Sequence, residues 1–241
     1  MFMPIKAGPA VNKVRRSLLC IAEFFPLPEV HRMLVSSDGL DLLRVNPAAI
    51  SCCIKKGAKR RLFVSGGDWD INEVAPISEV RSLEYSAVHD IFIKGVSYKR
   101  TVQYAKMKKA VSLYIDGENK KPSSIGAYWC RSYEDIDEYF RKLDRAYESI
   151  KKDGYKTQKE VSLKNPDDSR SLADEIQVLI GRRGGLILGC GGTHRILIAQ
   201  SLGLERVYVR VAGIHEAFIG KDRRAKKLRD EVIRKIESLN E

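Results

Sequence analysis

The stretch that decides the fold covers residues 175–211 and reads EIQVLIGRRGGLILGCGGTHRILIAQSLGLERVYVRV. The run EIQVLIG, the turn RRGG and the run LIL predict two strands joined by a tight turn. A glycine cluster follows, then a helical pattern from His194 to Ser201, which Thr193 is placed to cap and Gly203 to close. The alternation in RVYVRV predicts a half-buried strand. This order of elements indicates a mixed α/β (α+β) domain.

The glycine cluster brings ligand-binding groups to the start of the predicted helix. Gly191, Gly192 and Thr193 are followed directly by His194 and Arg195. Amide groups at a helix N-terminus carry partial positive charge, and glycines let the backbone approach a ligand closely. These five residues predict a phosphate or pyrophosphate site, in which His194 and Arg195 are also candidate catalytic residues. The alternative is a tight strand-to-helix corner whose histidine and arginine face solvent.

The rest of the chain divides into three parts. Residues 1–41 predict a helical arm, residues 42–216 the main domain with a helical insert at about 71–130, and residues 217–241 a basic C-terminal helix. Strands are predicted at 42–45 and 61–65, and helices at 82–94 and 99–110. The clearest helix starts at the N-cap Ser132, with Asp135 three residues later, and ends at Gly154. The polar residues 158–174 predict a loop.

Bulk composition favours anionic partners and disfavours a membrane span. The formal net charge is +12 and the sequence pI is near 9.5, which suits nucleotides, nucleic acid or anionic lipid head groups. Much of the excess lies from Lys55 to Arg61 and from Lys221 to Lys235, so these stretches are candidate nucleic-acid contacts, although the second also fits a solvated helix. Five cysteines without metal-ligand spacing favour a reduced, cytoplasmic protein. The oligomeric state stays open.

Two carboxylates follow the predicted strand at 61–65. Asp68 and Asp70 are two residues apart, so on an extended backbone both face the same side. Beside a phosphate they would hold Mg²⁺ or act as a general base in phosphoryl transfer. The alternative is a turn with capping carboxylates around a buried Trp69.

Several motifs together resemble the ParB/sulfiredoxin superfamily. The order I-x-V-x-I-G-R-x-G, then GGTHR, then LGL before the last strand is similar to that superfamily's core, and GGTHR is close to the GGCHR turn of sulfiredoxins. It is also similar to the turn of ParB-like free serine kinases. The segments LLRVNPAAI (42–50) and LDRAYESIKKDGYKTQ (143–158) match as well. With GGDWD (66–70), the whole looks like an uncharacterised ParB-like group, over roughly residues 42–216.

This resemblance implies a small mixed sheet with helices and a nucleotide, ATP or CTP with Mg²⁺, at the glycine turn. It also implies that GGDWD shares the same cleft, and that His89 and His215 belong to the site. Thr193 stands where sulfiredoxins keep their catalytic cysteine, so sulfinic-acid reduction is not expected. The chain after the last strand is too short for a helix-turn-helix domain, so a partition role is not expected either.

The leading functional hypothesis is therefore a nucleotide-binding protein that hydrolyses a phosphate or transfers it to an unknown acceptor. One alternative is a DNA-binding protein or ParB-like nuclease. The other is a nucleotide-sensing adaptor without turnover.

Overall fold

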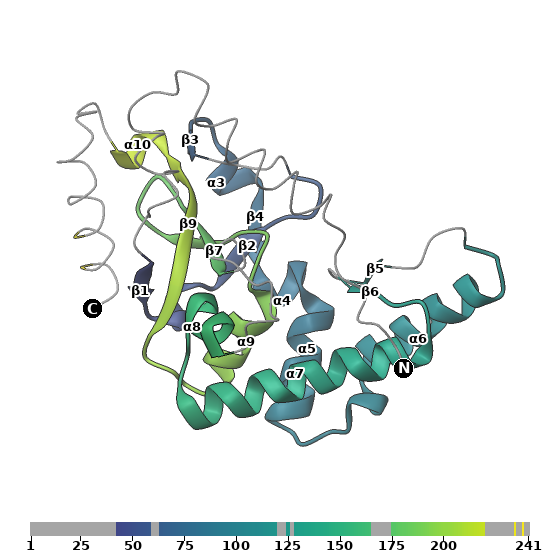
Figure 1. The fold of residues 1–241 in the computed structure, drawn as a ribbon. Coiled ribbons are helices and arrows are strands. Elements are labelled where there is room, and N and C mark those ends of the chain that lie inside the picture. The colour runs from purple at the N-terminus through teal and green to yellow at the C-terminus, as the bar shows by residue number, and fades with distance from the viewer. Residues whose placement is uncertain are drawn as a thin grey trace.

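A seven-stranded mixed sheet lies at the centre of the protein (Figure 1). The computed structural model describes residues 42–58, 63–119, 124–125, 128–164, 175–219, 234 and 238. The predicted arm at 1–41 and most of the predicted basic helix at 217–241 therefore lie outside the described residues. The strands of the sheet are β1 (Leu43–Val45), β2 (Cys52–Ile54), β3 (Phe63–Ser65), β4 (Val74–Pro76), β7 (Ile176–Ile180), β8 (Leu186–Leu188) and β9 (Val207–His215). A separate pair joins β5 (Ser124–Ile125) and β6 (Tyr128–Trp129).

Three parallel strands bring their carboxyl ends to one edge of the sheet. The strand order is β1-β9-β7-β8-β2-β4, and β3 also pairs with β9. β7 and β3 both run parallel to β9, with Ile180 opposite Ile214 and Ser65 opposite His215. The residues that follow β3, β7 and β9 therefore meet at the edge where ligands bind in open α/β sheets.

Eight α-helices accompany the sheet within the described residues, which confirms the predicted mixed α/β class. α9 (Thr193–Ser201) packs on β7, and α5 (Ser82–Phe92) and α7 (Tyr133–Asp153) pack on α9. α6 (Val102–Ile115) packs on α5 and α7, farther from the sheet (Figure 1). The other helical segments are η1 (Pro47–Ala49), α3 (Trp69–Asn72), α4 (Ile77–Val80), η2 (Tyr98–Arg100), α8 (Gln158–Lys164) and α10 (Glu216–Ile219). Within the described part of the chain, no helix is long and apolar enough to cross a membrane.

Each face of the sheet has its own hydrophobic cluster because side chains alternate along a strand. Ile176, Val178 and Ile180 of β7 belong to the larger cluster, which contains the buried residues of α9. Leu179 of β7 belongs to the smaller cluster, together with the buried Trp69 of α3. The central strand is therefore covered by α9 on one face and by the GGDWD segment on the other.

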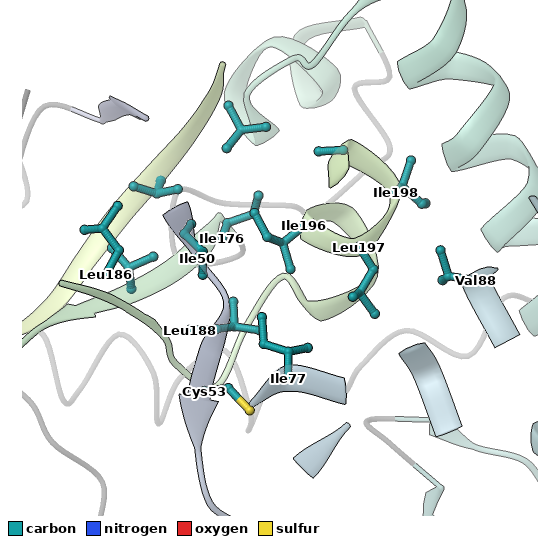
Figure 2. Close-up of a cluster of buried hydrophobic side chains, with 14 of the residues drawn as sticks. Ile50, Cys53, Ile77, Val88, Ile176, Leu186, Leu188, Ile196, Leu197 and Ile198 are labelled. Carbon is teal, nitrogen blue, oxygen red and sulfur yellow. The ribbon is translucent and has the colours of Figure 1, made fainter. Parts of the chain in front are cut away.

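Apolar side chains fix helix α9 against the sheet. Figure 2 shows Ile196 of α9 pointing toward Ile176 and Ile50, with Leu197 lying toward Val88 of α5. Ile196 is fully buried, and burying a side chain of this size stabilises a fold by about 1.5–3 kcal/mol. This packing holds the first turn of α9 at a defined place beside β7.

The longest helix, α7, starts and ends where its sequence predicts. Ser132 Oγ accepts a hydrogen bond from the Asp135 amide, and the Asp135 carboxylate accepts one from the Ser132 amide, which is a capping box. The chain leaves the helix at Gly154, whose φ of 75° lies in the left-handed region. The predicted apolar face packs inward: Ile136, Phe140, Leu143 and Ile150 are buried and Tyr147 is half-buried.

Two local predictions are wrong. Residues 158–164 form α8 rather than a loop, and residues 165–174 lie outside the described residues. Thr193 does not cap α9, because the helix already begins at Thr193 and Gly192 is the N-cap, without a side-chain hydrogen bond. Gly192 has a φ of 84°, a left-handed value that favours glycine over a residue with a side chain.

Candidate functional site

The predicted site residues fall into two groups at opposite ends of β7. Asp68, Asp70 and His215 lie at its carboxyl end, near Arg182. The glycine turn lies at its amino end, where Gly192 contacts Ile176. Gly192 lies beside Ile176 and Asp70 beside Gly181, and the five steps between Ile176 and Gly181, at about 3.3 Å each, put the two groups about 16 Å apart. The expectation that GGDWD and the glycine turn share one cleft is therefore wrong.

Arg182 organises the group at the carboxyl end. Its Nε donates to both Asp70 carboxylate oxygens at 3.0 and 3.1 Å, and its backbone amide donates to Asp70 Oδ2 at 2.8 Å. Its Nη2 lies 2.8 Å from Asp70 Oδ1, 2.7 Å from Asp68 Oδ1 and 3.0 Å from the Gly67 carbonyl oxygen. One guanidinium thus joins the loop after β7 to the loop after β3.

His215 completes this group from the end of β9. The Ala217 amide donates to His215 Nδ1 at 3.0 Å, so Nδ1 carries no proton, and Nε2 donates to the Gly67 carbonyl oxygen at 2.7 Å. The same Nε2 lies 3.7 Å from Asp70 Oδ1. The ring stacks on Trp69, with centroids 5.6 Å apart. Through these contacts the His215 ring holds the GGDWD loop against β9.

The charges of this group do not fit a magnesium site. Burial raises the pKa of Asp70, but the hydrogen bonds and charge of Arg182 outweigh it, and the net pKa lies below the usual range. The same contacts raise the pKa of Arg182. Arg182 thus already supplies the positive charge between Asp68 and Asp70 that Mg²⁺ would supply. Among the described residues, no group of three or more His, Cys, Asp or Glu side chains is placed to hold a metal ion.

At the other end of β7, the glycine turn depends on close backbone contact. A Cβ added to Gly192 would lie 2.6 Å from Ile176 Cα, so a side chain there would push α9 away from β7. The turn is tied to the strand by two backbone hydrogen bonds, from Gly189 N–H to the Gln177 oxygen and from Gln177 N–H to the Gly191 oxygen. These contacts explain why the chain needs glycines at this corner.

The turn leaves backbone donors at the start of α9. The first helical hydrogen bond runs from Ile196 N–H to the Gly192 oxygen at 3.0 Å. Among the described residues, the amide groups of Gly191, Gly192 and Thr193 have no hydrogen-bond acceptor. Successive backbone amides around a left-handed residue form a concave site for anions. The corner therefore has the donors that a phosphate requires.

Arg195 lies in the first turn of α9 and pairs with a buried carboxylate. Its Nη1 donates to Glu175 Oε2 at 3.1 Å and to the Tyr155 hydroxyl at 3.0 Å. The Glu175 side chain is fully buried, and its carboxylate also accepts from the Tyr155 hydroxyl and from the Gln158 amide. Burial, followed by the carboxylate of Glu175, raises the pKa of Tyr155 despite the opposing charge of Arg195. The positive charge of Arg195 is therefore neutralised by the Glu175 carboxylate.

His194 is the last member of a second hydrogen-bond chain, which starts at Gln103 and passes through Tyr139. Gln103 Nε2 donates to the Tyr139 hydroxyl at 2.8 Å, and that hydroxyl lies 2.7 Å from His194 Nε2. Burial lowers the pKa of His194 to about 4, and the Glu84 carboxylate opposes this only in part. His194 is therefore neutral at pH 7, and its Nε2 can accept the tyrosine proton. Neither His194 nor Arg195 brings net positive charge to the turn.

The remaining predicted residues are not brought to either group. His89 is exposed on α5, where its Nδ1 lies 4.0 Å from the Asp90 carboxylate. Lys55 donates from Nζ to the Asn72 carbonyl oxygen, and Lys56 is exposed. Residues 59–62, and all of 220–241 except Arg234 and Ser238, lie outside the described residues. The predicted nucleic-acid contacts at 55–61 and 221–235 are therefore described only in part.

Sequence reasoning missed the partners that define both groups. Arg182 directly follows the strand β7, and Glu175 directly precedes it, so a search for charged residues at strand ends would have found both. Tyr139 lies on the apolar face of α7, where a buried hydroxyl requires a hydrogen-bond partner. That requirement is a sequence signal for a buried polar contact, but it does not identify His194.

Comparisons with known proteins identify no related protein. No family model, curated protein or solved structure matches the chain. The resemblance to the ParB/sulfiredoxin superfamily stays a prediction.

Proposed function

We propose that the protein binds a nucleotide, such as ATP or CTP, through its phosphates at the glycine turn. The observation that carries this proposal is the run of three amide groups, of Gly191, Gly192 and Thr193, without acceptors among the described residues. They lie at the N-terminus of a nine-residue helix, whose dipole adds partial positive charge. The Thr193 hydroxyl is a further donor at the same place.

The proposal is limited to binding because the predicted catalytic carboxylates lie elsewhere. Asp68 and Asp70 are bound by Arg182 at the far end of β7. Glu175 lies near the turn, but its carboxylate already accepts from Arg195 and Tyr155. The geometry therefore favours the nucleotide-sensing hypothesis over phosphoryl transfer.

A charge placed in the first turn of α9 tests the proposal. Thr193→Asp adds a carboxylate that helix α9 tolerates at its N-terminus but that repels a phosphate. Thr193→Asn has the same shape without the charge and is the matched control. Thermal unfolding of the wild type and both variants is measured with ATP, CTP, GTP and pyrophosphate, each with and without Mg²⁺.

We expect at least one nucleotide to raise the Tm of the wild type by about 5–10 °C at a concentration a hundredfold above its Kd. Thr193→Asn keeps most of this increase, and Thr193→Asp loses it while its Tm without ligand is unchanged or higher. The proposal fails if no nucleotide or pyrophosphate stabilises the wild type. It also fails if Thr193→Asp is stabilised as strongly as Thr193→Asn.

A further inference from the structure

The helical insert carries a run of positive charge without carboxylates. Between Ile91 and Ile115 the chain contains no aspartate or glutamate. In the same interval it contains six basic residues, all of them exposed: Lys94, Lys99, Arg100, Lys106, Lys108 and Lys109. Part of the excess positive charge of this protein, whose net charge is +12, is therefore concentrated between residues 91 and 115.

Five of these residues lie on the exposed sides of helix α6 and of the preceding η2, which together we call the α6 basic surface. Its members are Lys99, Arg100, Lys106, Lys108 and Lys109. The buried face of α6 is formed by Gln103, Met107 and Val111, so Lys109 lies on the opposite, exposed face and Lys106 lies beside it. Lys99 lies 5.8 Å from the Tyr98 ring centroid, and Lys108 lies 5.9 Å from that of Tyr133.

These basic residues do not stabilise helix α6, so helix stability does not explain their presence. Lys99 and Arg100 lie at its N-terminus, where the helix dipole disfavours cations. Lys106 and Lys109 are three residues apart, so they repel each other. Among the described residues Lys94 pairs with Asp90 at 2.9 Å, but no residue of the α6 basic surface makes an ion pair. On α7, by contrast, Glu138 pairs with both Arg141 and Arg145.

The shape of the surface suits a phosphate backbone better than a lipid bilayer. From Val102 to Lys109 the helix rises about 10 Å at 1.5 Å per residue, which spans about three phosphate steps of a nucleic-acid strand at about 3.4 Å each. A helix that inserts into a membrane interface needs a broad exposed apolar face. Here the apolar side of α6 is buried, and the exposed Val102 and Ile115 lie at opposite ends of the helix.

We propose that the α6 basic surface binds nucleic acid by contacting the phosphate backbone without reading the base sequence. This surface is distinct from the glycine turn and from the basic stretches at 55–61 and 221–235. Attraction to phosphates releases bound counterions, so the affinity depends steeply on salt concentration.

Paired charge reversals on the full-length chain test this proposal. Lys106→Glu with Lys109→Glu changes the α6 basic surface, and Lys142→Glu with Lys159→Glu reverses two exposed lysines on α7 and α8. Both double variants lower the net charge by the same amount. Binding to labelled 20-nucleotide single strands, to 20-base-pair duplexes and to phosphatidylserine vesicles is measured between 50 and 300 mM salt, with melting curves to check the fold.

We expect the wild type to bind nucleic acid with an affinity that falls as salt rises. The α6 double variant loses at least about tenfold in affinity at 100 mM salt, and its log–log salt slope decreases by about 2, because two phosphate contacts are lost. The control double variant changes affinity by less than about threefold. Equal losses in both double variants, no binding of either nucleic acid, or binding to vesicles alone would each overturn the proposal.

Discussion

At the carboxyl end of β7, Arg182 binds both Asp68 and Asp70, whereas at the amino end the amides of Gly191, Gly192 and Thr193 have no acceptor among the described residues. The first arrangement joins the loop after β7 to the loop after β3, and its opposite charges pair with one another. The second leaves backbone donors at the start of a helix. The comparison teaches that a cluster of charged residues can be a structural clamp, while an uncharged glycine corner is the better candidate for a ligand site.

The largest effect is expected from removing Asp70, which is the buried carboxylate of the clamp formed by Arg182, Asp68 and Asp70. The Asp70 side chain is only 6% exposed and accepts hydrogen bonds from the Arg182 guanidinium and backbone amide. Removing this carboxylate leaves the Arg182 backbone amide and Nε without their acceptor, so Asp70→Ala is expected to lower the free energy of unfolding by about 2–3 kcal/mol. Urea unfolding measures this change. A loss below about 1 kcal/mol would mean that the clamp contributes little.

The next effect concerns His194, the half-buried histidine at the glycine turn. His194 has a pKa of about 4 in the folded protein, below its ordinary value near 6.5. Between these values the unfolded chain binds a proton that the folded protein does not, so stability falls as pH is lowered. From pH 6.5 to 5 the loss is about 1.6 kcal/mol. The lowered pKa of Asp70 keeps the stabilising contribution of that carboxylate intact over this interval.

Two substitutions isolate the histidine in this pH dependence. His194→Gln removes the titrating group and keeps a side chain that can bond to Tyr139, so its stability is expected to vary less between pH 6.5 and 5. His89→Gln changes an exposed histidine and serves as the control. Urea unfolding at several pH values gives both slopes. If His194→Gln and His89→Gln have the same slope as the wild type, the pKa of His194 is not lowered in the folded protein.

The smallest effect is expected from the exposed carboxylate of the clamp. The Asp68 side chain is 65% exposed, although it lies 2.7 Å from Arg182 Nη2. Exposed ion pairs contribute little because water and salt screen them, so Asp68→Ala is expected to lower the free energy of unfolding by less than about 1 kcal/mol. Comparing it with Asp70→Ala in the same unfolding assay sharpens the contrast. Equal losses would show that burial does not govern the clamp.

Much of the local structure could be predicted because it depends on neighbouring residues. The capping box at Ser132 and Asp135, and the two strands around the RRGG turn, follow from spacing and turn chemistry. The cap of α9 could not be predicted in the same way. Thr193 is a good capping residue by type, but the helix begins at Thr193 itself, with the left-handed Gly192 as its N-cap packed closely beside Ile176.

The site residues were predicted by type rather than by arrangement. Asp70 and Arg182 are 112 positions apart in the chain, and nothing in their local sequence pairs them. Asp68 and Asp70 were expected on an extended backbone, but Asp68 precedes the helix α3 and Asp70 lies in its first turn. Their common partner is decided by the loop after β7, which lies near them only in the folded sheet.

By itself, the sequence determined the alternating strands, the main helix and its cap, the glycine corner, and the run of positive charge on α6, because each depends on residues close together in the chain. Only the tertiary structure decided that β3, β7 and β9 run parallel and end at one edge, that Arg182 occupies both aspartates, and that the glycine turn lies about 16 Å from them. Strand order decides which loops lie side by side, and therefore which charged residues from distant segments can pair. Strand order itself depends on burying the apolar side chains of both faces of the sheet.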